Sequence, residues 1–318
     1  MRNRRHVAPA AIALAALAAV LAVAAPGYFA PDNLRDLFLA NMPVLIVALG
    51  ATLVILTGQI DISSGSAFAI CSVAAGALAK AGLPAPAAAL GACVVGVTLG
   101  AVNGALVAYR GIPSIVATLA AMVALRDALR WVTEGAWVQN LPAGFQWFGL
   151  TQSSYPLFAF LSVAILVLVV VVGMRHLAAG RWVYATGSNA ESARLAGIDT
   201  ALVTFWAFAA AGVFTGFAAA LNAVRFDQIP PNTGLGLELQ VIAAVVVGGT
   251  AITGGRGSIV GTVLGVALLG AIGPALTFLG VSAYWERAIQ GGIILAAVAV
   301  EAIRARLQKN GRVLANQS

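Results

Sequence analysis

The sequence is poor in charged residues. It carries 18 basic and 11 acidic side chains, only 9% of 318 residues, where an average soluble domain has about 25%. Apolar residues make up 61% of the chain. A soluble protein of this composition could not cover its surface with polar groups, so we exclude a globular soluble protein. Intrinsic disorder is excluded as well, because disordered chains are rich in charge and poor in apolar residues.

Cysteine and histidine are nearly absent. Cys71 and Cys93 both lie inside apolar runs, so we interpret them as buried hydrophobic residues, not as a disulfide or a metal pair. His6 and His176 flank apolar runs, and the sequence therefore offers no histidine at membrane depth for a proton relay.

Lysine and the motifs of enzyme active sites are also scarce. Neither Lys80 nor Lys309 belongs to a glycine-rich phosphate loop, which excludes ATP binding by a P-loop in this chain. The sequence contains no HExxH motif, no GxSxG elbow and no pair of catalytic carboxylates. We therefore expect no catalytic residue, no metal site and no cofactor held by the chain itself.

Long apolar runs dominate what is present. A helix that spans a bilayer needs about 20 mainly apolar residues, and the runs lack the two-residue alternation of membrane strands. We expect a single transmembrane domain over 1–318, an all-α polytopic membrane protein with about ten transmembrane helices. The expected spans are 8–25, 37–57, 62–80, 86–109, 112–130, 157–174, 201–223, 238–253, 258–279 and 285–303.

The distribution of basic residues predicts the orientation. An even number of spans places both termini on one side, and cytoplasmic segments are enriched in Lys and Arg. With the termini inside, twelve basic residues lie on the inner side and six on the outer side. We therefore expect a cytoplasmic N-terminus (1–7), a cytoplasmic loop (175–200) and a cytoplasmic C-terminus (304–318). No contiguous basic face lies outside the bilayer, which excludes nucleic-acid binding.

The first apolar run also resembles a signal peptide, because it follows three arginines and ends in small residues. Pro26 directly after those residues, and a run long enough to span, favour an uncleaved first helix.

Glycines recur at a spacing of four in three of the expected spans. This spacing places them on one helix face, where small residues let two backbones approach closely. We expect a compact bundle. The glycines concerned are Gly96, Gly100, Gly104, Gly212, Gly216, Gly257, Gly261 and Gly265.

Two short Gly- and Ser/Thr-rich segments, 56–66 and 247–258, interrupt apolar stretches at corresponding points of the two halves. Interrupted helices at matching positions indicate a transport pathway, but such segments can also be ordinary turns with polar helix caps. Asp61, the acidic residue nearest to membrane depth, shares this ambiguity. It is either a functional carboxylate or a cap on the helix that follows.

The inner loop 175–199 predicts a short surface helix. Ser188 and Glu191 have the spacing of a capping box, and Gly197 supplies a stop. The helix over 189–196 is either a connection or a docking element for a cytoplasmic subunit.

Six motifs stand out along the chain: LVILTGQIDISSGS (53–66), NGALVAYRGIP (103–113), ATL (117–119), YATGSNAESARLAGI (184–198), ELQVIAAVVVGGT (238–250) and GGRGSIVG (254–261). Together they resemble the ribose-type permeases of bacterial ABC sugar importers, a family related to the branched-chain amino acid permeases. The resemblance extends from about residue 35 to 300. At three positions, Gln59, Ser64 and Gln240, this family usually has Gly, an apolar residue and Asp, so the solute can differ from ribose.

The resemblance implies a mechanism. Two permease chains, copies or sisters, would form a pore in the bacterial inner membrane. A periplasmic solute-binding protein would deliver a monosaccharide or similar solute, and a cytoplasmic ABC ATPase would bind ATP and Mg and drive import. The implied ATPase-coupling residues are Ser188, Asn189, Glu191, Ala193, Arg194 and Gly197, and the implied pathway residues are Asp61, Ser63, Ser64, Thr250 and Thr253.

Three alternatives stay open at this point. An ion-coupled secondary transporter would bind its coupling ion at Asp61. A branched-chain amino acid permease would share the importer architecture, and a membrane scaffold would transport nothing.

Overall fold

The computed structural model describes residues 4–295 except 283, 287 and 294. Within this part the chain is helical, and its only β pairing is an isolated bridge between Val138 and Ile229. The expected all-α class is therefore confirmed. The helices are α1 (Arg4–Ala24), η1 (Pro26–Phe29), α2 (Pro31–Leu56), α3 (Ser64–Lys80), α4 (Ala85–Ala108), α5 (Ser114–Thr133), η2 (Gln146–Gly149), α6 (Tyr155–His176), α7 (Ala178–Ser188), α8 (Ala190–Leu195), α9 (Thr200–Ala223), α10 (Leu237–Val247) and α11 (Ile259–Phe278).

Five helices of the described chain are long and apolar enough to cross a membrane: α2, α4, α6, α9 and α11. The apolar part of α1 and the whole of α3 are shorter, at 17 residues each. Helix α5 has 20 residues, but its second half carries Arg126, Asp127 and Arg130.

The expectation of a full span over 238–253 is wrong. Helix α10 has 11 residues, about 16 Å at 1.5 Å per residue, which is near half the hydrocarbon thickness. The helix ends at Val247, with Gly248 as its C-cap, because Gly249 adopts a left-handed backbone, with φ +88°. The expected tenth span (285–303) lies largely, and the expected C-terminus (304–318) wholly, outside the described residues.

Close backbone packing at glycine joins α4 to α9. A Cβ added to Gly96 would overlap the carbonyl oxygen of Gly212, and one added to Gly216 would lie 2.7 Å from the Cα of Cys93. Gly261 and Gly265 pack in the same way against the end of α10. The predicted use of glycine for close helix packing is confirmed at these positions, since no side chain fits between the paired backbones. It is wrong for Gly257, which lies before the start of α11 and faces the side chain of Thr250.

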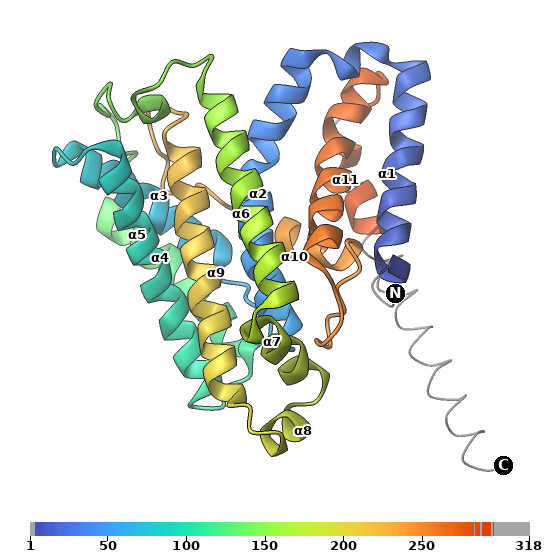
Figure 1. Ribbon diagram of the computed structural model, residues 1–318. Helices are drawn as coiled ribbons and strands as arrows, with labels where there is room; N and C mark the ends of the chain where they lie inside the picture. Colours follow the sequence, from blue (N-terminus) through green and yellow to red (C-terminus); the bar gives the residue numbers. More distant parts are fainter. Residues whose placement is uncertain (1–3, 283, 287, 294, 296–318) are drawn as a thin grey trace.

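Helix α2 connects two groups of helices (Figure 1). One group contains α3, α4, α5 and α9, and the other contains α1, α10 and α11. Helix α2 contacts α9 on one side and both α10 and α11 on the other. Its C-terminal half is almost wholly buried, from Ile46 to Leu56 apart from Leu53. The hydroxyl groups of Thr52 and Thr262, 2.7 Å apart, add a polar link between α2 and α11.

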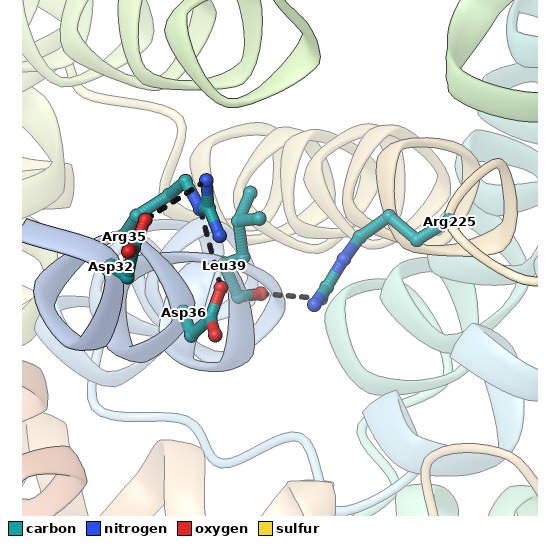
Figure 2. Close-up of polar contacts among 5 residues, drawn as sticks. All are labelled: Asp32, Arg35, Asp36, Leu39 and Arg225. Atoms are coloured by element: carbon teal, nitrogen blue, oxygen red, sulfur yellow. Dashed lines mark hydrogen bonds and ion pairs between the residues drawn. The ribbon is translucent and has the colours of Figure 1, made fainter. Parts of the chain in front are cut away.

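Arg225 ties the end of α9 to the N-terminal half of α2. Its Nη1 donates a hydrogen bond to the carbonyl oxygen of Leu39 over 2.6 Å, while Asp32, Arg35 and Asp36 form exposed ion pairs one to two turns away (Figure 2). Helix α7 contacts α2 and α9 at the opposite end of the bundle (Figure 1).

Candidate functional site

The segment between α2 and α3 runs without helical structure from Thr57 to Ser63. Two hydroxyl groups of α5 satisfy its backbone: Ser114 Oγ accepts from the amide of Ile60 over 3.1 Å, and Thr118 Oγ1 accepts from the amide of Ile62 over 3.1 Å. An extended backbone inside a membrane protein requires such partners, so this segment is a built part of the fold.

Asp61 turns the chain into α3. Its carboxylate accepts from the amide of Ser63 over 2.8 Å and from the hydroxyl of Ser63 over 2.7 Å. Asn103 of α4, itself buried, donates to the same hydroxyl over 2.8 Å. This geometry is an Asx turn at a helix start, and it uses the carboxylate as a local hydrogen-bond acceptor.

The second interrupted segment, between α10 and α11, folds back on itself. Its turn is closed by hydrogen bonds from Ala251 N to Arg256 O (2.8 Å) and from Gly254 N to Ala251 O (3.0 Å). Thr250 is buried and Thr253 is exposed. Ser258 then caps α11, with its Oγ accepting from Gly261 N over 3.0 Å. The helix breaks predicted in both halves are thus present.

The two interrupted segments meet, a contact that sequence reasoning did not predict. The amide of Gly255 donates to the carbonyl oxygen of Leu56 over 2.9 Å. A Cβ added to Gly254 would lie 2.6 Å from Gly58 N. A Cβ added to Gly187, near the end of α7, would overlap the oxygen of Leu56 and lie 2.6 Å from Gly255 N. Three segments far apart in sequence therefore converge at one point.

Helix α7, which the sequence did not predict, is held on this point. Tyr184 donates its hydroxyl to the carbonyl oxygen of Gly257 over 3.1 Å, and Ser188 donates to the carbonyl oxygen of Gly255 over 3.5 Å. Burial raises the pKa of Tyr184 above its ordinary value, although the nearby Arg175 acts in the opposite direction. The phenol therefore stays protonated and remains a donor.

Helix α8 projects beyond the point where these segments meet. Asn189 caps it, with its side-chain oxygen accepting from Ser192 N over 2.9 Å. The expected Ser188–Glu191 capping box is wrong, because Ser188 is the last residue of α7. Gly197 ends the segment as expected, with φ +81°.

The side chains of α8 divide between two environments. Ala193 is buried against the bundle, whereas Glu191, Arg194 and Leu195 are exposed, Leu195 to 86%. An exposed acidic, basic and apolar triplet on one short helix is suited to contact another protein. The six expected coupling residues thus lie in one stretch at the end of the bundle, and their role stays a prediction.

Two cavities lie along the opposite half of α2. The larger, about 820 Å³, runs from Asn33 near the start of α2 to Val266 in α11. The smaller, about 450 Å³, lies beneath the loop that joins α9 to α10. None of the predicted pathway residues lines either cavity. The polar residues that line the larger one are Asn33, Asp36, Asn41, Gln240, Glu286 and Gln290.

The polar lining of the cavities has a clear chemical character. Apart from Thr233 and Trp137 in the smaller cavity, it consists of amides and carboxylates, and among the described lining residues none is lysine or arginine. Sequence reasoning missed these positions except Gln240, which it marked only as a departure from a motif. A neutral, hydroxyl-bearing molecule fits such a lining better than an anion does, because the carboxylates repel negative charge.

Comparisons with known proteins agree with this architecture. A family described as the branched-chain amino acid transport system / permease component matches residues 33–298. Among individual relatives, the autoinducer 2 import system permease protein LsrC of Salmonella typhi is 35% identical, covering 98% of this chain and 90% of its own length. LsrC of Yersinia pseudotuberculosis serotype O:1b is 35% identical, covering 98% of this chain and 89% of its own length. No solved structure gives a significant match.

The family model and the relatives match most of the chain, and the interrupted helices and the cavities of an apolar helix bundle agree with that match. The chain belongs to the family of branched-chain amino acid transport system permease components, and it is a multi-pass permease subunit of an ABC importer in the bacterial inner membrane.

Proposed function

We propose that this permease carries a neutral, hydroxyl-bearing solute of monosaccharide size into the cytoplasm. A periplasmic binding protein delivers the solute to the end of the bundle with the two cavities. A cytoplasmic ABC ATPase, which binds ATP and Mg, docks on α7 and α8. Two permease chains, copies or sisters, complete the pore, and the chain crosses the membrane about ten times with both termini in the cytoplasm.

The arrangement along α2 carries this proposal. The N-terminal half of α2 lines both cavities, and its C-terminal residue, Leu56, accepts the hydrogen bond from Gly255 beside α7. A movement of α7 is therefore transmitted to the end of the helix that lines the cavities. The inner segments hold twelve of the 18 basic residues when α7 and α8 face the cytoplasm, which supports that orientation.

The class of solute is supported by the lining. An amino acid zwitterion needs a partner for its carboxylate, and the described lining residues of both cavities include no cationic side chain. The relatives are named for import of autoinducer 2. Amides and carboxylates are suitable partners for the hydroxyl groups of a sugar-like solute.

Reconstitution tests the proposal. The chain would be co-expressed with the ATPase and the binding protein encoded beside its gene, and the complex would be placed in liposomes. We expect uptake of autoinducer 2 or ribose that requires ATP and persists when ionophores collapse all ion gradients, with no uptake of leucine. Uptake that stops with the ion gradient while ATP is maintained would overturn the proposal in favour of an ion-coupled carrier. Uptake of leucine alone would favour an amino acid permease.

A further inference from the structure

The two cavities are separated by a small set of residues that lines both. Four residues belong to both linings: Ala40 and Val44 of α2, Leu235 of the loop before α10, and Gln240 of α10. Gln240 is the only polar residue among the four. A solute that passes from the smaller cavity to the larger one therefore meets a single polar side chain at the boundary.

Each of the other amides of the larger cavity donates a hydrogen bond to another group of the protein. Asn33 Nδ2 donates to Tyr28 O over 2.6 Å, and Asn41 Nδ2 donates to Leu37 O over 2.9 Å. Gln290 Nε2 donates to Glu286 Oε1 over 3.0 Å. These bonds hold the three side chains in position, so each of the three amides has a donor group committed to the fold.

Gln240 differs because its side chain makes no hydrogen bond within the described part of the chain, and the residue is exposed at the cavity wall. Its backbone is fixed in the first turns of α10, whose amide at Gln240 donates to Gly236 O over 3.3 Å. The residue therefore combines a rigid backbone with an uncommitted amide. Such an amide can donate one hydrogen bond to a solute and accept another from it, and no hydrogen bond within the protein has to be broken first.

We propose that Gln240 is a specificity-determining residue of this permease, which recognises a neutral solute through a pair of hydroxyl groups at the boundary between the two cavities. The inference rests on the proposed function and extends it to one residue. A primary amide offers an oxygen acceptor and an N–H donor side by side, and adjacent hydroxyl groups match both. An anionic group would meet the acceptor oxygen of Gln240 together with the carboxylate of Glu286, so the site discriminates against it.

Three substitutions separate the properties of this amide. Gln240→Leu removes both the donor and the acceptor at similar size. Gln240→Glu keeps the acceptor oxygen, replaces the donor with a second acceptor oxygen and adds a negative charge. Gln240→Asn keeps the chemistry but shortens the reach by one methylene group, and it serves as the conservative variant. Gln152→Leu, in an exposed loop outside both cavities, is the matched control.

The test measures uptake by the complete complex in liposomes, with autoinducer 2 and ribose as probes. For the solute carried by the wild type, we expect Gln240→Leu to raise the concentration at half-maximal uptake about tenfold, as the loss of two net hydrogen bonds implies. Gln240→Glu should raise it by a similar factor, and Gln240→Asn by less. The control Gln152→Leu should leave uptake and ATPase activity as in the wild type, and assembly with the ATPase is checked for each Gln240 variant.

Two results overturn the inference. The first is a concentration at half-maximal uptake that is the same in Gln240→Leu, Gln240→Glu and the wild type. The second is an equal loss in Gln228→Leu, since Gln228 lines only the smaller cavity and makes no side-chain hydrogen bond in the described chain. If Gln240→Leu does not assemble with the ATPase, the concentrations at half-maximal uptake of Gln240→Glu and Gln240→Asn test the inference in its place. A wild-type complex that takes up neither probe with ATP overturns the proposed function together with this inference, whereas a functional wild type with unaffected variants overturns this inference alone.

Discussion

The carboxylate of Glu238, in the first turn of α10, lies directly against Gly65, in the first turn of α3. Glu238 is 8% exposed, and its Oε2 has no hydrogen-bond partner in the described chain. A Cβ added to Gly65 would overlap this oxygen and lie 2.6 Å from Gly234 O. The two shortened helices thus touch at their starts.

Gly65→Ala should destabilise the permease. The added methyl group has to displace either a buried carboxylate or the backbone of Gly234, and overpacking of this kind costs about 1–3 kcal/mol. We expect the melting temperature of the purified chain in detergent to fall by roughly 2–10 °C. Gly173→Ala in α6 is the control, because its Cβ would meet only Leu177 Cδ1, at 3.8 Å. Equal melting temperatures for the two variants would contradict the contact.

Glu238→Ala provides a second check on the same contact. In that background the methyl group of Gly65→Ala no longer meets the carboxylate, and only Gly234 O, at 2.6 Å, still crowds it, so the effects of the two substitutions should add only in part. The double variant should melt at a higher temperature than the sum of the single effects predicts. Simple additivity would mean that Gly65 and Glu238 act independently.

Asp61→Asn should retain uptake. The side-chain oxygen of asparagine can still accept from the amide and hydroxyl of Ser63, so the start of α3 is preserved. Asp61→Ala removes that acceptor, which costs about 0.5–2 kcal/mol at a helix start, and it should reduce uptake and stability together. ATP-dependent uptake and the melting temperature are measured for both. Loss of uptake in a stable Asp61→Asn variant would mean that the charge is needed, as an ion-coupled carrier requires.

Much of the fold follows from local properties of the sequence. Run length and composition predict the helices over 86–109, 157–174 and 201–223 to within two residues of α4, α6 and α9. Glycine spacing predicts close packing, because four residues return to the same face of a helix. These features need no knowledge of distant parts of the chain.

The remaining features depend on contacts between distant segments. The apolar pattern continues past Val247, but α10 stops there, since Gly254 must approach Gly58 and Gly255 must reach Leu56. Ser188 and Asn189 are equally good caps by sequence, and the hydrogen bond from Ser188 to Gly255 keeps Ser188 in α7. Likewise, a role for a single amide such as Gln240 can be inferred only from the cavities that α2 and α10 line together.

Gly187→Ala should uncouple transport from the ATPase. The added methyl group would overlap Leu56 O and come within 2.6 Å of Gly255 N, where these two atoms share a 2.9 Å hydrogen bond. Helix α7 would be forced away from the end of α2. We expect ATP-dependent uptake to fall at least about tenfold, equivalent to ~1.4 kcal/mol, while membrane insertion is unchanged. Unchanged uptake per inserted molecule would show that α7 does not transmit movement through this contact.

Glu191→Lys should weaken the association with the ATPase. Glu191 lies exposed in the first turn of α8, where an acidic side chain also favours the helix by about 0.3–1 kcal/mol through the helix dipole. Glu191→Gln removes the charge without reversing it, and Asn189→Ala removes the cap on Ser192 N without altering charge. If charge at the surface of α8 recruits the partner, Glu191→Lys should lower the co-purified ATPase several-fold, Glu191→Gln less, and Asn189→Ala only as far as the helix frays. If Glu191→Lys and the wild type recover the same amount of ATPase, α8 is excluded as the docking element. If only Asn189→Ala loses ATPase, then the stability of α8, and not its charge, supports docking.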